Sequence, residues 1–168
     1  MTALYARATQ QQVTVLKSPL TRTPCIGVCS TTSVGDRVCR GCKRYAFEVI
    51  RWNGYQDEEK ASVLRRIETL TVQIMQDKLR IVSEQALQEG MFRLRLPLNV
   101  ALSPYCWVNT LLQKAPLEQL DLADFGIAVA PAYAHLGARA LADVIDSELL
   151  LLCDAHFDRY YQLVDSFS

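Results

Sequence analysis

Four cysteines lie close together near the start of the chain, and they constrain its fold more than any other feature. They are Cys25, Cys29, Cys39 and Cys42, spaced C-x3-C-x9-C-x2-C. Closely paired thiolates select zinc or iron–sulfur centres, because each pair can supply two ligands to one metal or cluster. The nine residues between the pairs are long enough for the chain to fold back. The spacing therefore predicts one four-cysteine metal site.

Two disulfides, or four unrelated thiols, are the alternatives to a metal site. Disulfides belong to oxidising compartments, and the chain begins MTALYARATQ, which has neither the apolar run nor the cleavage site of a secretory signal. We therefore expect a cytoplasmic protein with metal-binding cysteines. The spacing matches neither ferredoxin pattern. Two short loops suit a closed tetrahedral site, so the residues alone slightly favour zinc over an iron–sulfur cluster.

The residues around the cysteines resemble a known family. Residues 24–67 are similar to DUF1289, a small bacterial domain in which a P-C-x3-C…C-x-G-C set precedes an R-x3-E-[IV]-x2-W segment and an acidic helix start. The matching residues are Pro24, Cys25, Cys29, Cys39, Gly41, Cys42, Arg44, Glu48, Val49, Trp52 and 57–60. The chain departs from the pattern at Tyr45, where the family usually has a small hydroxyl residue, and at Gly54-Tyr55. The resemblance implies an iron–sulfur or other metal-binding protein, which makes zinc and iron–sulfur equally expected.

Charge is distributed unevenly along a chain that is neutral as a whole. Residues 1–56 carry eight Lys and Arg against two Asp and Glu, a net +6, whereas residues 91–168 carry five against nine, a net −4. The cations can offset thiolate charge, dock on the acidic C-terminal half, or form a basic face for nucleic acid or an acidic partner. The first use is favoured, because no nucleic-acid-binding motif accompanies the charges. The cations concerned are Arg37, Arg40, Lys43, Arg44 and Arg51.

Residues next to the second cysteine pair are candidates for supporting the metal or contacting a partner. Glycine inside the C-x2-C pair leaves room for backbone N–H groups to face the thiolates. The tryptophan is expected to anchor the core, with shielding of the metal as the alternative. The candidates are Arg40, Gly41, Lys43, Arg44 and Trp52.

The sequence as a whole predicts a mainly α-helical protein in three parts. Residues 1–23 are expected to form a flexible tail, residues 24–66 the four-cysteine module, and residues 67–168 a helical domain with at most one short strand pair. Alternating apolar residues predict a strand over 92–100, paired with the apolar run 127–130. Helical periodicity and caps predict the remaining elements: helices over 44–52, 57–90 with a break near 69–72, 103–114 and 131–164 with an interruption at 137, and a helical turn over 116–125.

No second group of residues forms a recognisable catalytic pattern. Cys106 is expected to be a buried small side chain. Cys153 and His156 lie one helical turn apart but lack further ligands at a metal-binding spacing, and His135 stands alone. The chain has no phosphate-binding loop and no nucleophile elbow. We therefore expect no catalytic residues.

These observations favour a regulatory or protein-interaction module built on the metal site, with an unidentified protein partner. An iron–sulfur redox or oxygen-sensing protein is the alternative, and nucleic-acid binding through the basic module is a weaker one. No apolar run approaches the roughly 20 residues that cross a bilayer, so no membrane contact is expected.

Overall fold

The computed structural model describes residues 21–162, so most of the tail predicted over residues 1–23 lies outside the described part. The prediction of a mainly α-helical protein is confirmed. The helices are α1 (Ser30–Val34), α2 (Ala46–Arg51), α3 (Asp57–Lys78), α4 (Glu84–Arg93), α5 (Pro104–Lys114) and α6 (Ala138–Phe157). The strands are β1 (Leu79–Ile81) and β2 (Ile127–Val129), which form one antiparallel pair. Short 3-10 turns follow α2 and connect α5 to β2 and β2 to α6.

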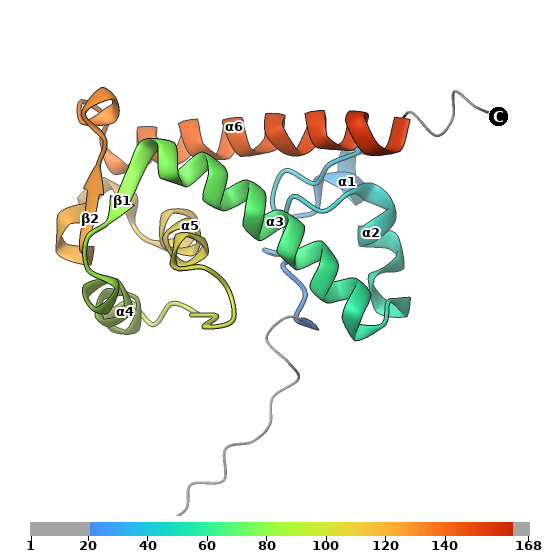
Figure 1. Ribbon diagram of the computed structural model, residues 1–168, viewed down its shortest axis with the longest axis horizontal. Helices are drawn as coiled ribbons and strands as arrows, with labels where there is room; N and C mark the ends of the chain where they lie inside the picture. The colour runs from blue at the N-terminus through green and yellow to red at the C-terminus, as the bar shows by residue number, and fades with distance from the viewer. Residues whose placement is uncertain (1–20, 163–168) are drawn as a thin grey trace, which may run out of the picture.

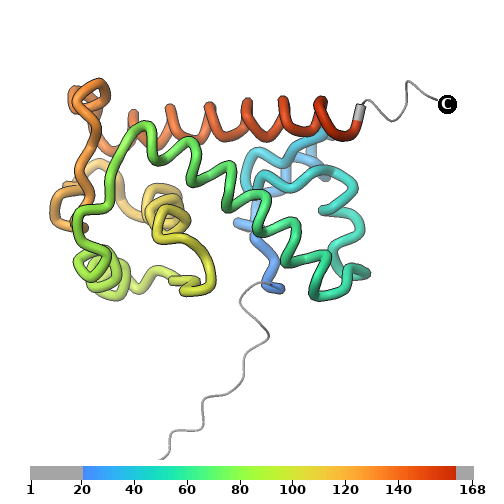
Figure 2. The backbone as a smooth tube through the Cα atoms, viewed as in Figure 1, coloured from blue at the N-terminus to red at the C-terminus, as the bar shows by residue number. Residues whose placement is uncertain are grey.

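Helices α3 and α6 connect the two ends of the molecule. Helix α6 runs along one side and α3 crosses beneath it, with the cysteine segment, α1 and α2 at one end and α4, α5 and the strand pair at the other (Figures 1 and 2). The boundary predicted between residues 66 and 67 falls inside α3. Both ends of the protein therefore pack against the same two helices.

The apolar core is divided in the same way. The larger cluster lies between α4, α5 and the first half of α6, and includes Leu87, Val108, Leu111 and Leu141, all with fully buried side chains. A smaller cluster joins the cysteine module to α3 and α6. It consists of Val38, Tyr45, Leu70, Leu149 and Cys153.

Helix α3 begins at residue 57, as predicted, but ends at residue 78 rather than at residue 90. Gln56 precedes the first turn, and its backbone N–H donates to the Glu59 carboxylate at 2.8 Å. The helix shows no break near residue 70 and ends at Lys78. That lysine is buried and donates to Glu148 of α6 at 2.5 Å, so the end of α3 is fixed by a tertiary ion pair that periodicity does not reveal.

The prediction of a strand over residues 92–100 is wrong. Helix α4 extends to Arg93, and the chain then turns through Arg95, whose φ is +55°. Leu94, Leu96 and Leu98 still pack against the larger core, but from an irregular segment rather than from a strand. The strand at 127–129 exists and pairs with β1 instead, with Leu79 opposite Val129. Alternating apolar residues thus reflect one-sided burial here without a hydrogen-bonded partner strand.

The predicted limits of α5 and α6 are close to those observed. The Ser103 hydroxyl accepts a hydrogen bond from the Tyr105 N–H at 3.4 Å, and Pro104 occupies the first helical position. Gly137 separates the turn over Pro131–Tyr133 from α6, as predicted. Among residues 21–162, no helix is both long enough and apolar enough to cross a membrane.

Replacing Leu141 by alanine should lower the free energy of unfolding by about 2–5 kcal/mol, because its buried side chain would leave a cavity in the larger core. Leu151→Ala is the matched control, since that side chain on the same helix is 69% exposed. Urea denaturation of the two variants measures the difference. Equal losses of unfolding free energy in the two variants would contradict the assignment of Leu141 to the buried face of α6 and of Leu151 to its exposed face.

Candidate metal centre

A tight hairpin places Cys39 and Cys42 side by side. Val38 and Tyr45 form an isolated antiparallel bridge at its base. Within it the Cys39 N–H donates to the Arg44 carbonyl at 2.8 Å and the Lys43 N–H donates to the Cys39 carbonyl at 2.8 Å. Both cysteines are buried, and their thiol groups interact directly. The C-x2-C spacing thus folds into the kind of loop that presents two sulfur atoms to one side.

Lys43 closes this hairpin in an unusual conformation. Its φ is +62°, a left-handed value that normally favours glycine. The side chain is 2% exposed, and its Nζ donates to the Asp146 carboxylate of α6 at 2.6 Å and to the Arg40 carbonyl. A glycine would adopt the backbone turn more easily but would lose the ion pair, so lysine here connects the hairpin to α6.

The two hairpin thiols differ in acidity. Burial is the largest influence on Cys39 and raises its pKa, but hydrogen bonds from the backbone of Cys42, Ser30 and Gly41 and from the Cys42 side chain lower it to about 6. Burial raises the pKa of Cys42, although the Arg44 guanidinium opposes this effect. The structure therefore favours a thiolate at Cys39 at neutral pH, which is the form that binds metal.

Arg44 lies directly against the sulfur of Cys42. Its Nε donates to Cys42 Sγ at 3.3 Å, and its guanidinium group lies 4.6 Å from the centre of the Trp52 ring. Both Arg44 and Trp52 are buried. A cation is thus held next to a cysteine sulfur by an aromatic ring, and its charge partly offsets the effect of burial on the pKa of that thiol.

The first cysteine pair lies in a more open loop. Cys25 is exposed, and the Gly27 N–H donates to its Sγ at 3.5 Å, with Gly27 at a φ of +95°. Cys29 is partly buried and directly precedes α1. The loop is tied to the hairpin by the Arg40 N–H, which donates to the Ser30 hydroxyl at 2.9 Å.

Gly41 allows the two loops to touch. A methyl group at this position would lie 2.8 Å from Ile26 Cγ1 and 3.1 Å from the Val28 carbonyl oxygen. Both distances are shorter than ordinary contacts. The loop that carries Cys25 and Cys29 therefore packs on the hairpin that carries Cys39 and Cys42, at the position where the sequence has no side chain.

The arrangement brings together two of the four predicted ligands. Within residues 21–162, no three or more His, Cys, Asp or Glu side chains converge as a metal-binding group. Cys39 and Cys42 lie together in the hairpin as free thiols. Cys25 and Cys29 lie in the adjoining loop and do not complete a four-cysteine ligand set. The four-cysteine centre therefore remains a prediction. In the structure, Cys39 and Cys42 lie in a buried hairpin, and the loop with Cys25 and Cys29 lies next to it and is more open.

A buried network behind the hairpin was not predicted from the sequence. Tyr45 is fully buried, its hydroxyl is 2.9 Å from His156 Nδ1 and the Arg66 guanidinium lies 3.8 Å from the centre of its ring. Arg66 also forms a bidentate ion pair with buried Glu48, which accepts from the Tyr45 N–H at 2.8 Å. In the sequence, the indication of this network was Tyr45, which stands where the DUF1289 pattern usually has a small hydroxyl residue.

The acidic C-terminal helix explains much of the uneven charge. Arg37 donates to Asp154 and Asp158 of α6 and its immediate continuation, each at 2.6 Å, while Lys43 pairs with Asp146. Arg40 is exposed but pairs with Asp36 at 2.7 Å. Most cations of the cysteine module thus face carboxylates of their own chain or, as with Arg44, a sulfur atom. Docking within the chain, one of the three interpretations of the charge pattern, is observed.

The remaining titratable candidates occupy separate positions. Burial raises the pKa of Cys106 to about 12 and that of Cys153 to about 11, so both thiols stay protonated at neutral pH. His156 faces Tyr45, and His135 is exposed. These side chains do not combine into a second metal site within the described part of the chain.

A family model described as "Protein of unknown function (DUF1289)" matches residues 23–71. The resemblance inferred from the cysteines and their neighbours is therefore confirmed over this stretch, which ends within α3. No curated protein and no solved structure matches the chain.

Replacing Gly41 by alanine should destabilise the protein by about 1–3 kcal/mol, because the new methyl group would push against Ile26 and Val28. Gly54→Ala is the control, since a methyl group there meets nothing within 4 Å. Urea denaturation measures both variants. Adding Ile26→Ala to Gly41→Ala should recover part of the loss, and no recovery would refute contact between the two loops.

Acid should weaken docking of the hairpin on α6. Hydrogen bonds from Arg37 lower the pKa of Asp154 below its ordinary 3.8, so the ionised carboxylate stabilises the folded state above that value and the contribution is lost as the pH falls through the lower folded value. Between about pH 5 and about pH 2, the melting temperature of Arg37→Met should therefore fall less steeply with decreasing pH than that of the unsubstituted protein. Arg51→Met, an exposed cation, should keep the original slope. Equal slopes in the two variants would disprove this role of Arg37.

Proposed function

We propose that this protein is a metal-binding module in which Cys25, Cys29, Cys39 and Cys42 hold one zinc ion or iron–sulfur cluster. The observation that carries the proposal is the buried Cys39–Cys42 hairpin, in which hydrogen bonds lower the pKa of the Cys39 thiol to about 6. A structural disulfide or an inert thiol has no need of such stabilisation of the thiolate. The adjoining loop, which packs on Gly41 through Ile26 and Val28, carries two further thiols, those of Cys25 and Cys29.

The donor set suits a soft metal or cluster. Four thiolates bind zinc or iron–sulfur centres, and the hydrogen bond from Arg44 to Cys42 would reduce the cost of gathering negative charge. When bound, the metal would crosslink the two loops and so contribute to folding of the module. Zinc and an iron–sulfur cluster remain equal candidates.

The proposed role is regulatory or protein-binding rather than catalytic. Four protein ligands would leave no open coordination position on a zinc ion. Next to the cysteine loops, Val28 and Val34 are 73% and 66% exposed, and adjacent exposed apolar side chains are typical of protein contact surfaces. Intrachain pairing of Arg37 and Lys43 weighs against a nucleic-acid face.

Metal and acid-labile sulfide measured after anaerobic purification test the proposal. We expect about one equivalent of zinc, or iron with matching sulfide and visible absorbance. Iron with sulfide would favour the redox or oxygen-sensing alternative and a measurement of reduction potential. Neither metal nor sulfide would overturn the metal-binding proposal.

Cys39→Ser should release most of the metal and lower the melting temperature, because metal binding and folding are linked. Cys106→Ser is the matched control: that cysteine lies on α5 with a protonated thiol, and the variant should keep its metal. Metal content and thermal melting are measured on both. Full metal retention in Cys39→Ser would exclude this cysteine as a ligand.

A further inference from the structure

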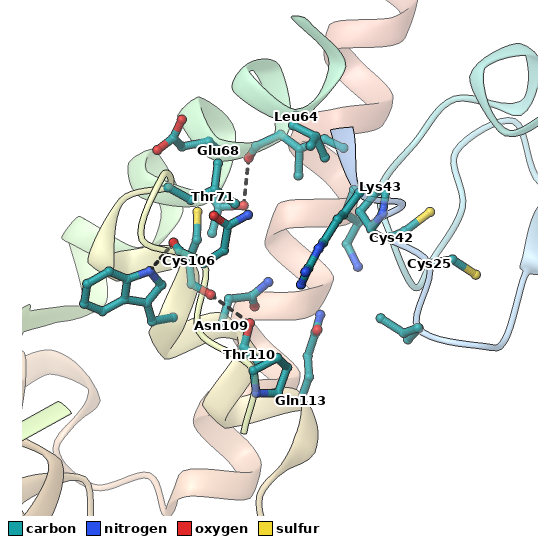
Figure 3. A pocket seen from close by; sticks show the side chains of 18 of the residues that line it. Cys25, Cys42, Lys43, Leu64, Glu68, Thr71, Cys106, Asn109, Thr110 and Gln113 are labelled. Carbon is teal, nitrogen blue, oxygen red and sulfur yellow. Dashed lines mark hydrogen bonds between the residues drawn. The ribbon is translucent and has the colours of Figure 1, made fainter. Parts of the chain in front are cut away.

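A cavity of about 500 Å³ separates the cysteine module from the helical body. It is bounded by residues 22–26 and the cysteine hairpin on one side and by α3, α5 and the segment after α4 on the other (Figure 3). This volume lies within the range typical of sites for small organic molecules, about 300–1,000 Å³. Of the proposed metal ligands, Cys25 and Cys42 lie on its wall, and the rest of the lining has no part in the proposed metal site.

The wall of the cavity is apolar over α3 and the irregular segment and polar over α5. Leu64 and Ile67 of α3 line it, together with Leu98, Leu102 and Trp107. The polar residues Asn109, Thr110 and Gln113 come from α5, and Figure 3 shows them grouped on one side, with Cys25, Cys42 and Lys43 on another. A ligand that fits these walls has an apolar body and a polar group.

Two carboxamides on this wall lack intramolecular partners. Within the described residues, the side chains of Asn109 and Gln113 form no hydrogen bond; Asn109 is half-buried and Gln113 is exposed. Thr110, in contrast, donates to the Cys106 carbonyl at 3.1 Å. Half-buried amide groups ordinarily find hydrogen-bond partners, so the Asn109 carboxamide is available to a bound molecule, and the exposed carboxamide of Gln113 lies on the same wall.

The charges that remain unpaired on the cavity wall are positive. Lys43 is neutralised by Asp146, and Glu68 pairs with Arg65 at 2.7 Å and accepts from the Ser103 N–H at 2.6 Å. Arg22 and Lys114 also line the cavity and form no ion pair within residues 21–162. The charge of the wall is therefore complementary to an anion.

We propose that this cavity binds a small organic monoanion with an apolar body, such as a medium-chain carboxylate. The carboxylate would interact with Arg22, Lys114 and the carboxamide N–H groups of Asn109 and Gln113, and the chain would lie against the apolar wall. The proposal goes beyond the metal-binding function and does not depend on it. Because Cys25 and Cys42 line the same cavity, the ligand would lie beside the cysteine module.

Isothermal titration of the full chain, as purified, with decanoate tests this site. We expect one binding site and at least tenfold weaker binding of decanol, which has the same apolar chain without the charge. The double variant Arg22→Glu, Lys114→Glu should weaken decanoate binding about tenfold, because two favourable exposed charges become unfavourable. Arg51→Glu, Arg80→Glu changes the net charge equally at exposed positions outside the cavity and should not affect the affinity.

Filling the cavity provides a second readout. Thr110→Phe should abolish decanoate binding by occupying the space, and Asn109→Leu, which keeps the branched shape of the side chain but removes its amide group, should weaken it. Circular dichroism melting shows whether each variant folds. Equal affinity for decanol and decanoate, equal losses in the two double-charge variants, or unchanged binding in folded Thr110→Phe would each overturn the proposal.

Discussion

The ion pair between the buried Lys43 ammonium group and the exposed Asp146 carboxylate connects the cysteine hairpin to α6. Lys43 lies in the left-handed turn that closes the cysteine hairpin, and its ammonium group reaches α6 across the module boundary. Arg37 extends the same contact to Asp154 and Asp158. Buried or partly buried pairs of this kind fix geometry more than they add net stability. The orientation of the hairpin, and hence of its two thiols, therefore depends on a helix about a hundred residues later in the sequence.

This dependence links the cysteine module to the rest of the chain. The family model ends within α3, so α6 and its carboxylates lie outside the matched residues. Tyr45, the departure from the family pattern, also contacts the C-terminal end of α6 through His156. A module with the family's usual small hydroxyl residue at this position would not make that contact. The C-terminal half thus provides a docking surface for the cysteine module through α6.

The cavity follows from the same arrangement. The hairpin docks on α6 and on α3, while α5 packs on the other end of both helices, and the space between these two contacts is not filled by side chains. A ligand or a metal bound at this junction would contact both halves of the protein.

The sequence by itself determined the elements whose signals are local. The four cysteines and their neighbours led to the family, Ser103-Pro104 gave the start of α5, and Gly137 separated α6 from the turn before it. Tertiary structure decided the rest, because the causes are distant in sequence: Lys78 at the end of α3 pairs with Glu148, and Leu94, Leu96 and Leu98 are partly buried against the larger core without a partner strand. The candidate metal site also has one part that the sequence predicts and another that only the tertiary structure decides. Spacing predicted a four-cysteine site, but only the tertiary structure shows that Cys39 and Cys42 are buried, because the hairpin that carries them packs against α3 and α6 through Val38 and Tyr45.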